Sequence, residues 1–254
     1  MSKNFELMQE AGISLGVPVI PEAKSRAKIF DRKKNGLTKS VDSNLDKVMR
    51  EESLKLVQSV FHSGRDGSPR VVVFAGIDSG SGCSGVCAHT AETLAGHKLG
   101  TVCLVDANLR SPALPDFFGV SNHFGLTDAL QQQGDIRGFS KQVREENLWL
   151  LSSGSLAGES TGLLNGDVMK ERVAELRKEF DFVLIDAPAL NTYADGVALA
   201  ELADGVILVL EANSTRREAA SKVTETLRSA QIKILGAVLN KRTYPIPESL
   251  YRRL

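Results

Sequence analysis

A series of short, almost wholly apolar segments constrains the fold of this chain more than any other feature. Such segments are typical of strands buried on both faces, which occur in parallel sheets covered by helices. They read RVVVFAG (70–76), GTVCLVDA (100–107), LWLLSSG (148–154), FDFVLIDAP (180–188), DGVILVLEA (204–212) and IKILGAVLN (232–240). Between them, apolar residues at helical spacing predict helices over 82–98, 124–132, 168–180, 194–203 and 216–230.

This alternation of strands and helices with short connections predicts a doubly wound α/β fold. The sheet is expected to be mostly parallel, with right-handed crossovers and helices on both faces. In such sheets, ligands bind at the carboxyl ends of the strands. Asp106 and Asp186 close two of the apolar segments, and the loop 78–82 follows a third. The pattern therefore places these residues on one rim of the sheet.

The first part of the chain differs from the rest. Residues 1–44 have little apolar periodicity, and between Lys24 and Lys39 there are seven Lys or Arg residues against one acid. We expect a flexible basic N-terminal arm over 1–44, which is either a solvated linker or a patch that touches a membrane surface or an acidic partner. A helix is expected over 45–63, at the start of one domain that spans 45–254.

Composition excludes several classes of protein. Lys plus Arg and Asp plus Glu balance at 31 each, so no overall basic field recruits nucleic acid. No apolar run approaches the roughly 20 residues that span a bilayer, and MSKNFELMQE lacks the apolar core of a signal peptide. We therefore expect a cytoplasmic protein. Three cysteines are too few, and odd in number, for a disulfide framework.

The loop SGSGCSG (79–85) has the form of a phosphate-binding loop that opens a helix. Glycines at 80 and 82 allow a sharp turn, and the helix that follows offers unpaired N–H groups to an anion. In a working loop, a Lys before Ser or Thr neutralises the phosphates and the hydroxyl binds Mg²⁺. Ser84 can bind the metal, whereas Cys83 cannot supply the charge. A tight turn built from small residues is the alternative interpretation.

Cys83 and Cys87 lie four positions apart on the same face of the predicted helix. A cysteine at a helix N-terminus can have a lowered pKa, which would make a redox switch. A metal site is a second alternative, although His89 points elsewhere on the helix and no fourth ligand is well spaced. The third is that both are small residues that fit a crowded turn.

Segments beyond the loop extend the pattern. They are VDANLRSPALPDFFG (105–119), LLSSGSLAGESTGLLN (150–165), FDFVLIDAPAL (180–190) and ILGAVLNKR (234–242). With the loop, they resemble the bacterial tyrosine autokinases of capsular and exopolysaccharide synthesis (BY-kinases, CpsD- or CapB-like). These kinases belong to the MinD/ParA-like deviant-Walker P-loop ATPases. The resemblance covers about residues 45–254 and implies a kinase domain that binds ATP or ADP with Mg²⁺.

The resemblance assigns roles to particular residues. The implied nucleotide-binding residues are Gly80, Ser81, Gly82, Cys83, Ser84, Gly85, Arg110 and Asn240, the last contacting the adenine. The implied Mg²⁺ ligands are Ser84, Asp106 and Asp186. One of the two aspartates would orient the water around Mg²⁺, and the other would activate the attacking hydroxyl.

This chain departs from the family at residues that carry chemistry. Where the family loop reads PGEGKST, the lysine is replaced by Cys83 and the last hydroxyl residue by Gly85; Asn108 replaces the second aspartate of the DAD stretch. The catalytic positions are therefore Asp106, Asp186, Asn108 and Cys83. Because phosphoryl transfer depends on positioning and charge, these changes indicate a severe loss of kinase activity.

Two outlying motifs also differ. The ring-forming ExxRxxRTN pattern of the family retains Glu52 and a Lys55, but has Gln58 in place of the second Arg. The tyrosine cluster of an autokinase tail is reduced to Tyr244 and Tyr251.

The first hypothesis is a degenerate autokinase that regulates or scaffolds exopolysaccharide polymerisation and export. The resemblance implies that it would bind the cytoplasmic tail of a membrane chain-length-determinant (Wzz-like) protein, which would recruit it to the inner face of the membrane, and would self-associate as a homo-oligomer. The second is an active tyrosine autokinase whose missing charge comes from Arg110 or a neighbouring subunit. The third, a partition- or division-type ATPase, lacks that family's extra lysine near Asp78.

Overall fold

The computed structural model describes residues 19–21, 39–61, 67–155 and 162–242, with side chains in these ranges from Met49 onward. The strands of this part of the chain form one eight-stranded sheet in the order β1-β8-β7-β2-β6-β3-β5-β4. They are β1 (Val19–Pro21), β2 (Val71–Gly76), β3 (Val102–Asp106), β4 (Lys141–Gln142), β5 (Leu148–Leu151), β6 (Phe182–Ala187), β7 (Gly205–Glu211) and β8 (Ile234–Arg242). Every neighbouring pair is parallel except β4 with β5.

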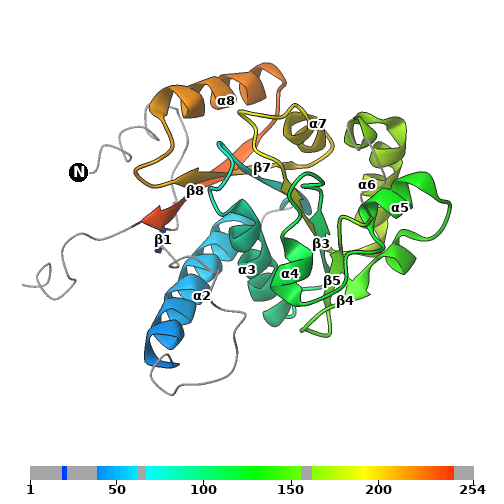
Figure 1. Cartoon of the computed structure of the whole chain (residues 1–254), viewed down its shortest axis with the longest axis horizontal. Coiled ribbons are helices and arrows are strands. Elements are labelled where there is room, and N and C mark those ends of the chain that lie inside the picture. Colours follow the sequence, from blue (N-terminus) through cyan, green and yellow to red (C-terminus); the bar gives the residue numbers. More distant parts are fainter. Residues whose placement is uncertain (1–18, 22–38, 62–66, 156–161, 243–254) are drawn as a thin grey trace, which may run out of the picture.

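Helices cover both faces of this sheet (Figure 1). The α-helices are α2 (Lys39–Phe61), α3 (Cys83–Gly96), α4 (Leu114–Phe118), α5 (Leu126–Gln131), α6 (Asp167–Glu179), α7 (Asp195–Glu201) and α8 (Arg217–Ser229). Short 3₁₀ helices span Ile136–Phe139 and Leu163–Asn165. Helices α2, α3 and α4 pack on one face of the sheet, and α5, α6, α7 and α8 on the other. The doubly wound, mostly parallel α/β fold predicted from the sequence is confirmed.

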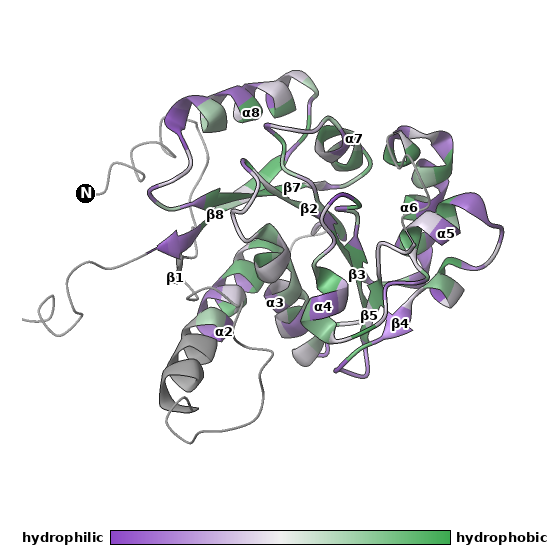
Figure 2. Cartoon of the chain, in the orientation of Figure 1, coloured by the Kyte–Doolittle hydropathy of each residue, from purple (hydrophilic) through white to green (hydrophobic). Residues whose placement is uncertain are grey.

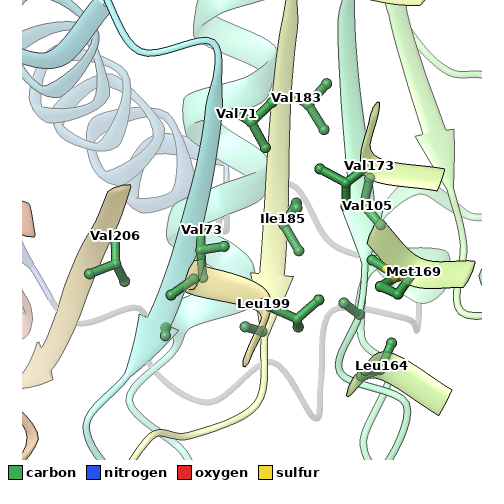
Figure 3. Packing of buried hydrophobic residues seen from close by; sticks show 14 of the residues in the cluster. Val71, Val73, Val105, Leu164, Met169, Val173, Val183, Ile185, Leu199 and Val206 are labelled. Carbon is green, nitrogen blue, oxygen red and sulfur yellow. The ribbon is translucent and has the colours of Figure 1, made fainter. Parts of the chain in front are cut away.

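The side chains of each central strand alternate between two apolar cores. In β2, Val71 and Val73 point into the core beneath α6 and α7, whereas Val72 and Phe74 point into the core beneath α2 and α3. Figure 3 shows the first core, in which Val73, Ile185 and Leu199 come together from β2, β6 and α7. Figure 2 shows that the central strands are coloured as hydrophobic along their length. Burial on both faces thus explains why these segments are continuously apolar.

The observed elements follow the predicted ones closely, with differences at the edges. Helix α2 begins at Lys39 rather than at 45, and β1 falls within the expected arm 1–44. Most of that arm lies outside the described residues, so its flexibility and its division from the domain 45–254 stay predictions. Sequence reasoning missed β4 because its two residues, at the sheet edge, form no apolar run. No helix in the described ranges is long and apolar enough to cross a membrane.

Candidate functional site

The loop between β2 and α3 is tightly folded against the end of the sheet. Gly80 and Gly82 have φ angles of 84° and 79°, a region that glycine adopts without strain. A Cβ on Gly82 would lie 2.4 Å from Nδ2 of Asn240, so a larger residue there would displace the asparagine. A Cβ on Gly76 would lie 2.4 Å from Oγ of Ser81, whose side chain is therefore packed beneath the loop. Ser81 can offer a ligand its backbone N–H, whereas its hydroxyl faces β2.

Helix α3 begins immediately after this loop, at Cys83, and leaves its first N–H groups available. Gly82 is the N-cap residue, and no described side chain caps the helix. The first bond of the helix runs from the N–H of Val86 to the carbonyl of Gly82, at 3.2 Å. Unpaired N–H groups at a helix N-terminus favour an anion. A Cβ on Gly85 would meet no atom within 4 Å, so the first turn also has room for the hydroxyl residue that the resemblance leads one to expect.

Asp106 and Asp186 lie side by side at the carboxyl ends of β3 and β6, as predicted. The two residues are paired in register, and both are fully buried. Oδ2 of Asp106 accepts a hydrogen bond from the N–H of Leu114 at 3.1 Å. Among the described residues, no donor forms a hydrogen bond of good geometry with Oδ1 of Asp106 or with either oxygen of Asp186. Buried polar atoms normally have partners, so these oxygens are available for a ligand.

Burial raises the pKa of Asp106 to about 8, and the neighbouring charge of Asp186 adds to the rise. Burial also raises the pKa of Asp186, to about 6, while the nearby side chains of Ser84 and Cys83 oppose that rise. The two carboxyls are therefore in an environment that disfavours two negative charges. A divalent cation bound between them would reverse that preference, because it favours the ionised form of both.

Cys83 lies beside Asp186 and belongs to the same electrostatic cluster. Burial raises the pKa of the Cys83 thiol well above its usual value, and the charge of Asp186 raises it further. Burial and the same carboxylate also raise the pKa of Cys87. The lowered pKa expected for a cysteine at a helix N-terminus is not observed for Cys83, because burial and the charge of Asp186 raise the pKa of its thiol. Within the described ranges, no group of three His, Cys, Asp or Glu side chains is placed to hold a metal ion.

Arg110 is on the same rim but interacts with other residues. Its guanidinium lies 3.2 Å from Oδ2 of Asp195, at the start of α7, and its Cζ lies 4.5 Å from the ring centre of Tyr193. Asn108 is half-buried, and its carbonyl accepts a hydrogen bond from the N–H of Ser111 at 3.1 Å. Both residues lie in the connection that follows Asp106, as the sequence implied.

Asn240, near the end of β8, reaches the loop from a strand distant in sequence. Its Nδ2 donates a hydrogen bond to the carbonyl of Ser81 at 2.8 Å, and the residue is buried. The structure thus places Asn240 as a support for the loop, while the adenine contact implied by the resemblance stays a prediction. The next residue, Lys241, was missed in the sequence analysis. Its Nζ donates to the carbonyl of Gly80 at 2.6 Å. The available signal was a cation that immediately follows Asn240 at a strand end.

Comparison with known proteins finds bacterial tyrosine-protein kinases that are similar to this chain in sequence. The tyrosine-protein kinase YwqD of Bacillus subtilis is 34% identical over 139 residues, which are 55% of this chain and 59% of YwqD. The putative tyrosine-protein kinase CapB of Staphylococcus aureus is 27% identical over 195 residues, 76% of this chain and 84% of CapB. The chain thus matches less than two thirds of the length of YwqD. No family model matches.

Solved structures agree with these relatives. The kinase domain of the Escherichia coli tyrosine kinase ETK superposes with a TM-score of 0.77 over 97% of this chain and 98% of its own, at 21% identity. The relatives and the structures together support the predicted resemblance to the bacterial tyrosine autokinases. The septum site-determining protein MinD of Pyrococcus horikoshii, solved with Mg-ADP, has a TM-score of 0.58 over 72% of this chain and 76% of its own, at 23% identity. This likeness of fold agrees with the relation of the autokinase family to the ParA/MinD P-loop ATPases.

The described residues include the loop and the acidic pair that the autokinase resemblance implies. The loop geometry, the strand-end position of Asp106 and Asp186, and the approach of Asn240 are all on one rim. The side chain beside Asp186 at the start of α3 is the thiol of Cys83, where the family motif has an ammonium group. Tyr244 and Tyr251, the remnants expected of the tyrosine tail, lie outside the described residues.

Proposed function

We propose that this chain is a degenerate tyrosine-autokinase-like P-loop protein that regulates or scaffolds exopolysaccharide or capsule polymerisation and export. It would bind ATP or ADP weakly and transfer phosphate slowly or not at all. The observation that carries the proposal is the position of Cys83, whose half-buried thiol lies beside Asp186 at the start of α3. A neutral thiol there cannot neutralise the phosphate that the loop would hold.

Replacement of the lysine by Cys83 should reduce the rate of phosphoryl transfer more than the affinity for nucleotide. A hydrogen bond to a charged group contributes about 1.5–3 kcal/mol to binding. Loss of one preorganised donor to developing charge costs roughly 2.7–4 kcal/mol in the barrier, or about 10²–10³ in rate. Asn108 is a second change at a position where the family has an aspartate. Binding would persist through the N–H groups of the loop, whereas transfer would lose its main electrostatic stabilisation.

The residues present fit a divalent cation. Oxygen ligands suit Mg²⁺, and Asp106 and Asp186 offer three buried oxygens that form no hydrogen bond of good geometry in the described part of the chain. Ser84 lies close enough to Asp186 to oppose the rise of its pKa. Mg²⁺ bound there would supply positive charge to the phosphates. The chain would contribute the acidic pair, the Ser84 hydroxyl and the first N–H groups of α3.

An active tyrosine autokinase is the alternative, and a specific observation favours it. Asp106 and Asp186, to which the resemblance gives the roles of binding Mg²⁺ and activating the attacking hydroxyl, lie in register on neighbouring strands. The missing charge would then have to come from another residue or a neighbouring subunit. Arg110 is a poor source, because Asp195 and Tyr193 hold its guanidinium.

A membrane protein of the chain-length-determinant (Wzz-like) class is the partner that the family resemblance supports. A structure of similar fold, the chimerical protein CapA2B2, has a TM-score of 0.75 at 19% identity. Self-association through α2 is a related proposal. In that helix, Nζ of Lys55 lies 2.6 Å from Oε1 of Glu52, one turn away, so these two members of the ring-forming pattern pair with each other. Copurification with a Wzz-like tail and sedimentation of the purified chain would test the two proposals.

The proposed function is tested by measuring binding and transfer together. The native chain is titrated with ATP and ADP, with and without Mg²⁺, and incubated with labelled ATP under the same conditions. We expect Mg²⁺-dependent binding with a Kd on the order of 10–1000 μM and no detectable phosphotyrosine. The kinase YwqD, assayed in parallel, is the positive control. Tyrosine phosphorylation by the native chain at the rate of YwqD would overturn the proposal and establish the alternative.

A further inference from the structure

Lys241 brings a positive charge to the loop from the opposite end of the sequence. Lys241 is the penultimate residue of β8, and its φ angle of 56° lies in the left-handed region that lysine seldom adopts. Its Nζ donates to the carbonyl of Gly80 at 2.6 Å and lies 3.2 Å from Oε1 of Glu211. The ammonium group is thus held at the loop by one carbonyl and one carboxylate.

The stem of Lys241 passes close to the backbone of the same loop. A Cβ built on Gly82 would lie 3.8 Å from Cε of Lys241. The side chain is 34% exposed, so its ammonium group is accessible to a ligand from solvent. A phosphate at the loop would compete with Glu211 for this cation, and the four-carbon stem of lysine gives the ammonium freedom to follow it.

The charge of Lys241 lies where the sequence lacks one. The first turn of α3 carries Cys83 at the position where the family motif has a lysine, and the carboxylates below it add negative charge. Arg110, the cation suggested by the sequence, is engaged by Asp195 and Tyr193. Lys241, by contrast, touches the loop itself.

We propose that Lys241 is the cation of the phosphate loop, and that it binds the phosphates of a nucleoside di- or triphosphate in place of the lysine replaced by Cys83. This inference rests on the proposed nucleotide binding. The ammonium group of Lys241 reaches the loop from β8, not from the start of α3 where Cys83 replaces the lysine of the motif. It would therefore supply positive charge for binding the phosphates. Phosphoryl transfer would still lack a charged donor at the start of α3.

The test is a set of matched variants titrated with Mg²⁺-ATP by calorimetry. Lys241→Gln removes the charge and is expected to weaken binding about 10-fold or more, as expected for loss of a charge-assisted hydrogen bond. Lys241→Arg keeps the charge and is expected to bind within about 3-fold of the native chain. Lys233→Gln removes the same charge just before β8, at the opposite end of that strand, and is expected to change the affinity little.

A double-variant comparison separates charge from loop support. In a Cys83→Lys background, which supplies the charge from α3, Lys241→Gln is expected to cost less than about 3-fold. A full 10-fold loss in that background would show that Lys241 only supports the loop, and would overturn the inference. Equal affinity of the native chain and Lys241→Gln would also overturn it, while nucleotide binding itself would stand. Absence of Mg²⁺-ATP binding by the native chain would overturn both.

Discussion

Two aspartates at opposite ends of the sheet have different surroundings. Asp204 lies just before the amino end of β7, and Asp186 lies at the carboxyl end of β6. Asp204 accepts hydrogen bonds from the N–H groups of Arg70 and Val71 at 2.7 and 2.8 Å, and from two guanidinium nitrogens of Arg177 at 3.0 and 2.8 Å. Asp186 is buried and no described donor forms a hydrogen bond of good geometry with it. Both carboxylate oxygens of Asp204 are paired, whereas those of Asp186 are open to a ligand.

The pKa directions follow this difference. Partial burial works against the charge of Asp204, but the hydrogen bonds from Arg177 and the backbone prevail and lower its pKa. Burial raises the pKa of Asp186 and of its neighbour Asp106. Paired charges at strand ends stabilise a fold, whereas buried unpaired ones are costly and are typical of binding or catalytic sites. This difference indicates that Asp204 stabilises the fold, and it supports the proposal that Asp106 and Asp186 bind a ligand.

The largest expected effect is at Asp204. Asp204→Ala leaves two backbone N–H groups and the guanidinium of Arg177 without this acceptor, and we expect a loss of about 3 kcal/mol in the free energy of unfolding. Urea denaturation measures it, and Asp204→Asn, which keeps one acceptor oxygen, should lose less. A loss below about 0.5 kcal/mol for the alanine variant would show that the hydrogen bonds of Asp204 contribute little to stability.

Substitution of Asp186, at the carboxyl-end rim, should affect ligand affinity rather than stability. Asp186→Asn removes a buried charge, so the free energy of unfolding should stay the same or rise by about 1 kcal/mol. Affinity for Mg²⁺-ATP should fall about 10-fold to 100-fold, because the cation loses a charged ligand. Urea denaturation and calorimetry measure the two quantities. A variant that is strongly destabilised, yet binds Mg²⁺-ATP as the native chain does, would show that Asp186 is structural.

The stability of the fold should depend on pH in opposite directions through these two sets of aspartates. Asp106 and Asp186 have raised pKa values in the folded state, to about 8 and about 6, so the folded state holds more protons than the unfolded state above pH 4. Their contribution to stability is present at acidic pH and is lost as pH rises from about 4 to 8, by at most about 1.4 kcal/mol per pH unit for each group. Asp204 and Asp181 have lowered pKa values, so their contribution is lost as pH falls below about 4.

This prediction is checked by urea denaturation without Mg²⁺ across pH 4 to 8. Asp106→Asn should flatten the decline, since it removes one titrating group and the charge that acts on the other. A decline of the same slope in this variant and in the native chain would contradict the assignment to the acidic pair.

The smallest effect is expected at Arg110. Its ion pair with Asp195 is partly exposed, so Arg110→Gln should cost only about 0.2–1 kcal/mol of unfolding free energy. Affinity for Mg²⁺-ATP should change less than about 3-fold. A 10-fold loss of affinity would instead make Arg110 the source of the missing charge.

The strands and the acidic pair were predictable because they depend on local pattern and on one rule of topology. Apolar runs identify strands buried on both faces, and parallel strands bring their carboxyl ends to one rim. Asp106 and Asp186 were therefore placed correctly from their positions in the sequence. The tight turn before α3 was predictable from its two glycines, Gly80 and Gly82.

The support of the loop from β8 was not predictable in the same way. The contacts of Asn240 and Lys241 with Ser81 and Gly80 join residues about 160 positions apart, and they depend on the sheet order and on the direction of two side chains. Likewise, the position of Cys83 at a helix N-terminus suggested a lowered pKa, whereas burial of the thiol and the charge of Asp186 raise that pKa. Local sequence carries no information on such three-dimensional neighbours.

The most direct test of a degenerate kinase compares phosphate transfer from ATP to tyrosine by the native chain and by Cys83→Lys/Asn108→Asp. The double variant restores the cation at the start of α3 and the second aspartate of the family motif. We expect no detectable transfer by the native chain and a gain of at least about 100-fold in the variant, in line with one restored electrostatic donor. Transfer by the native chain at a rate equal to that of the double variant would contradict the account.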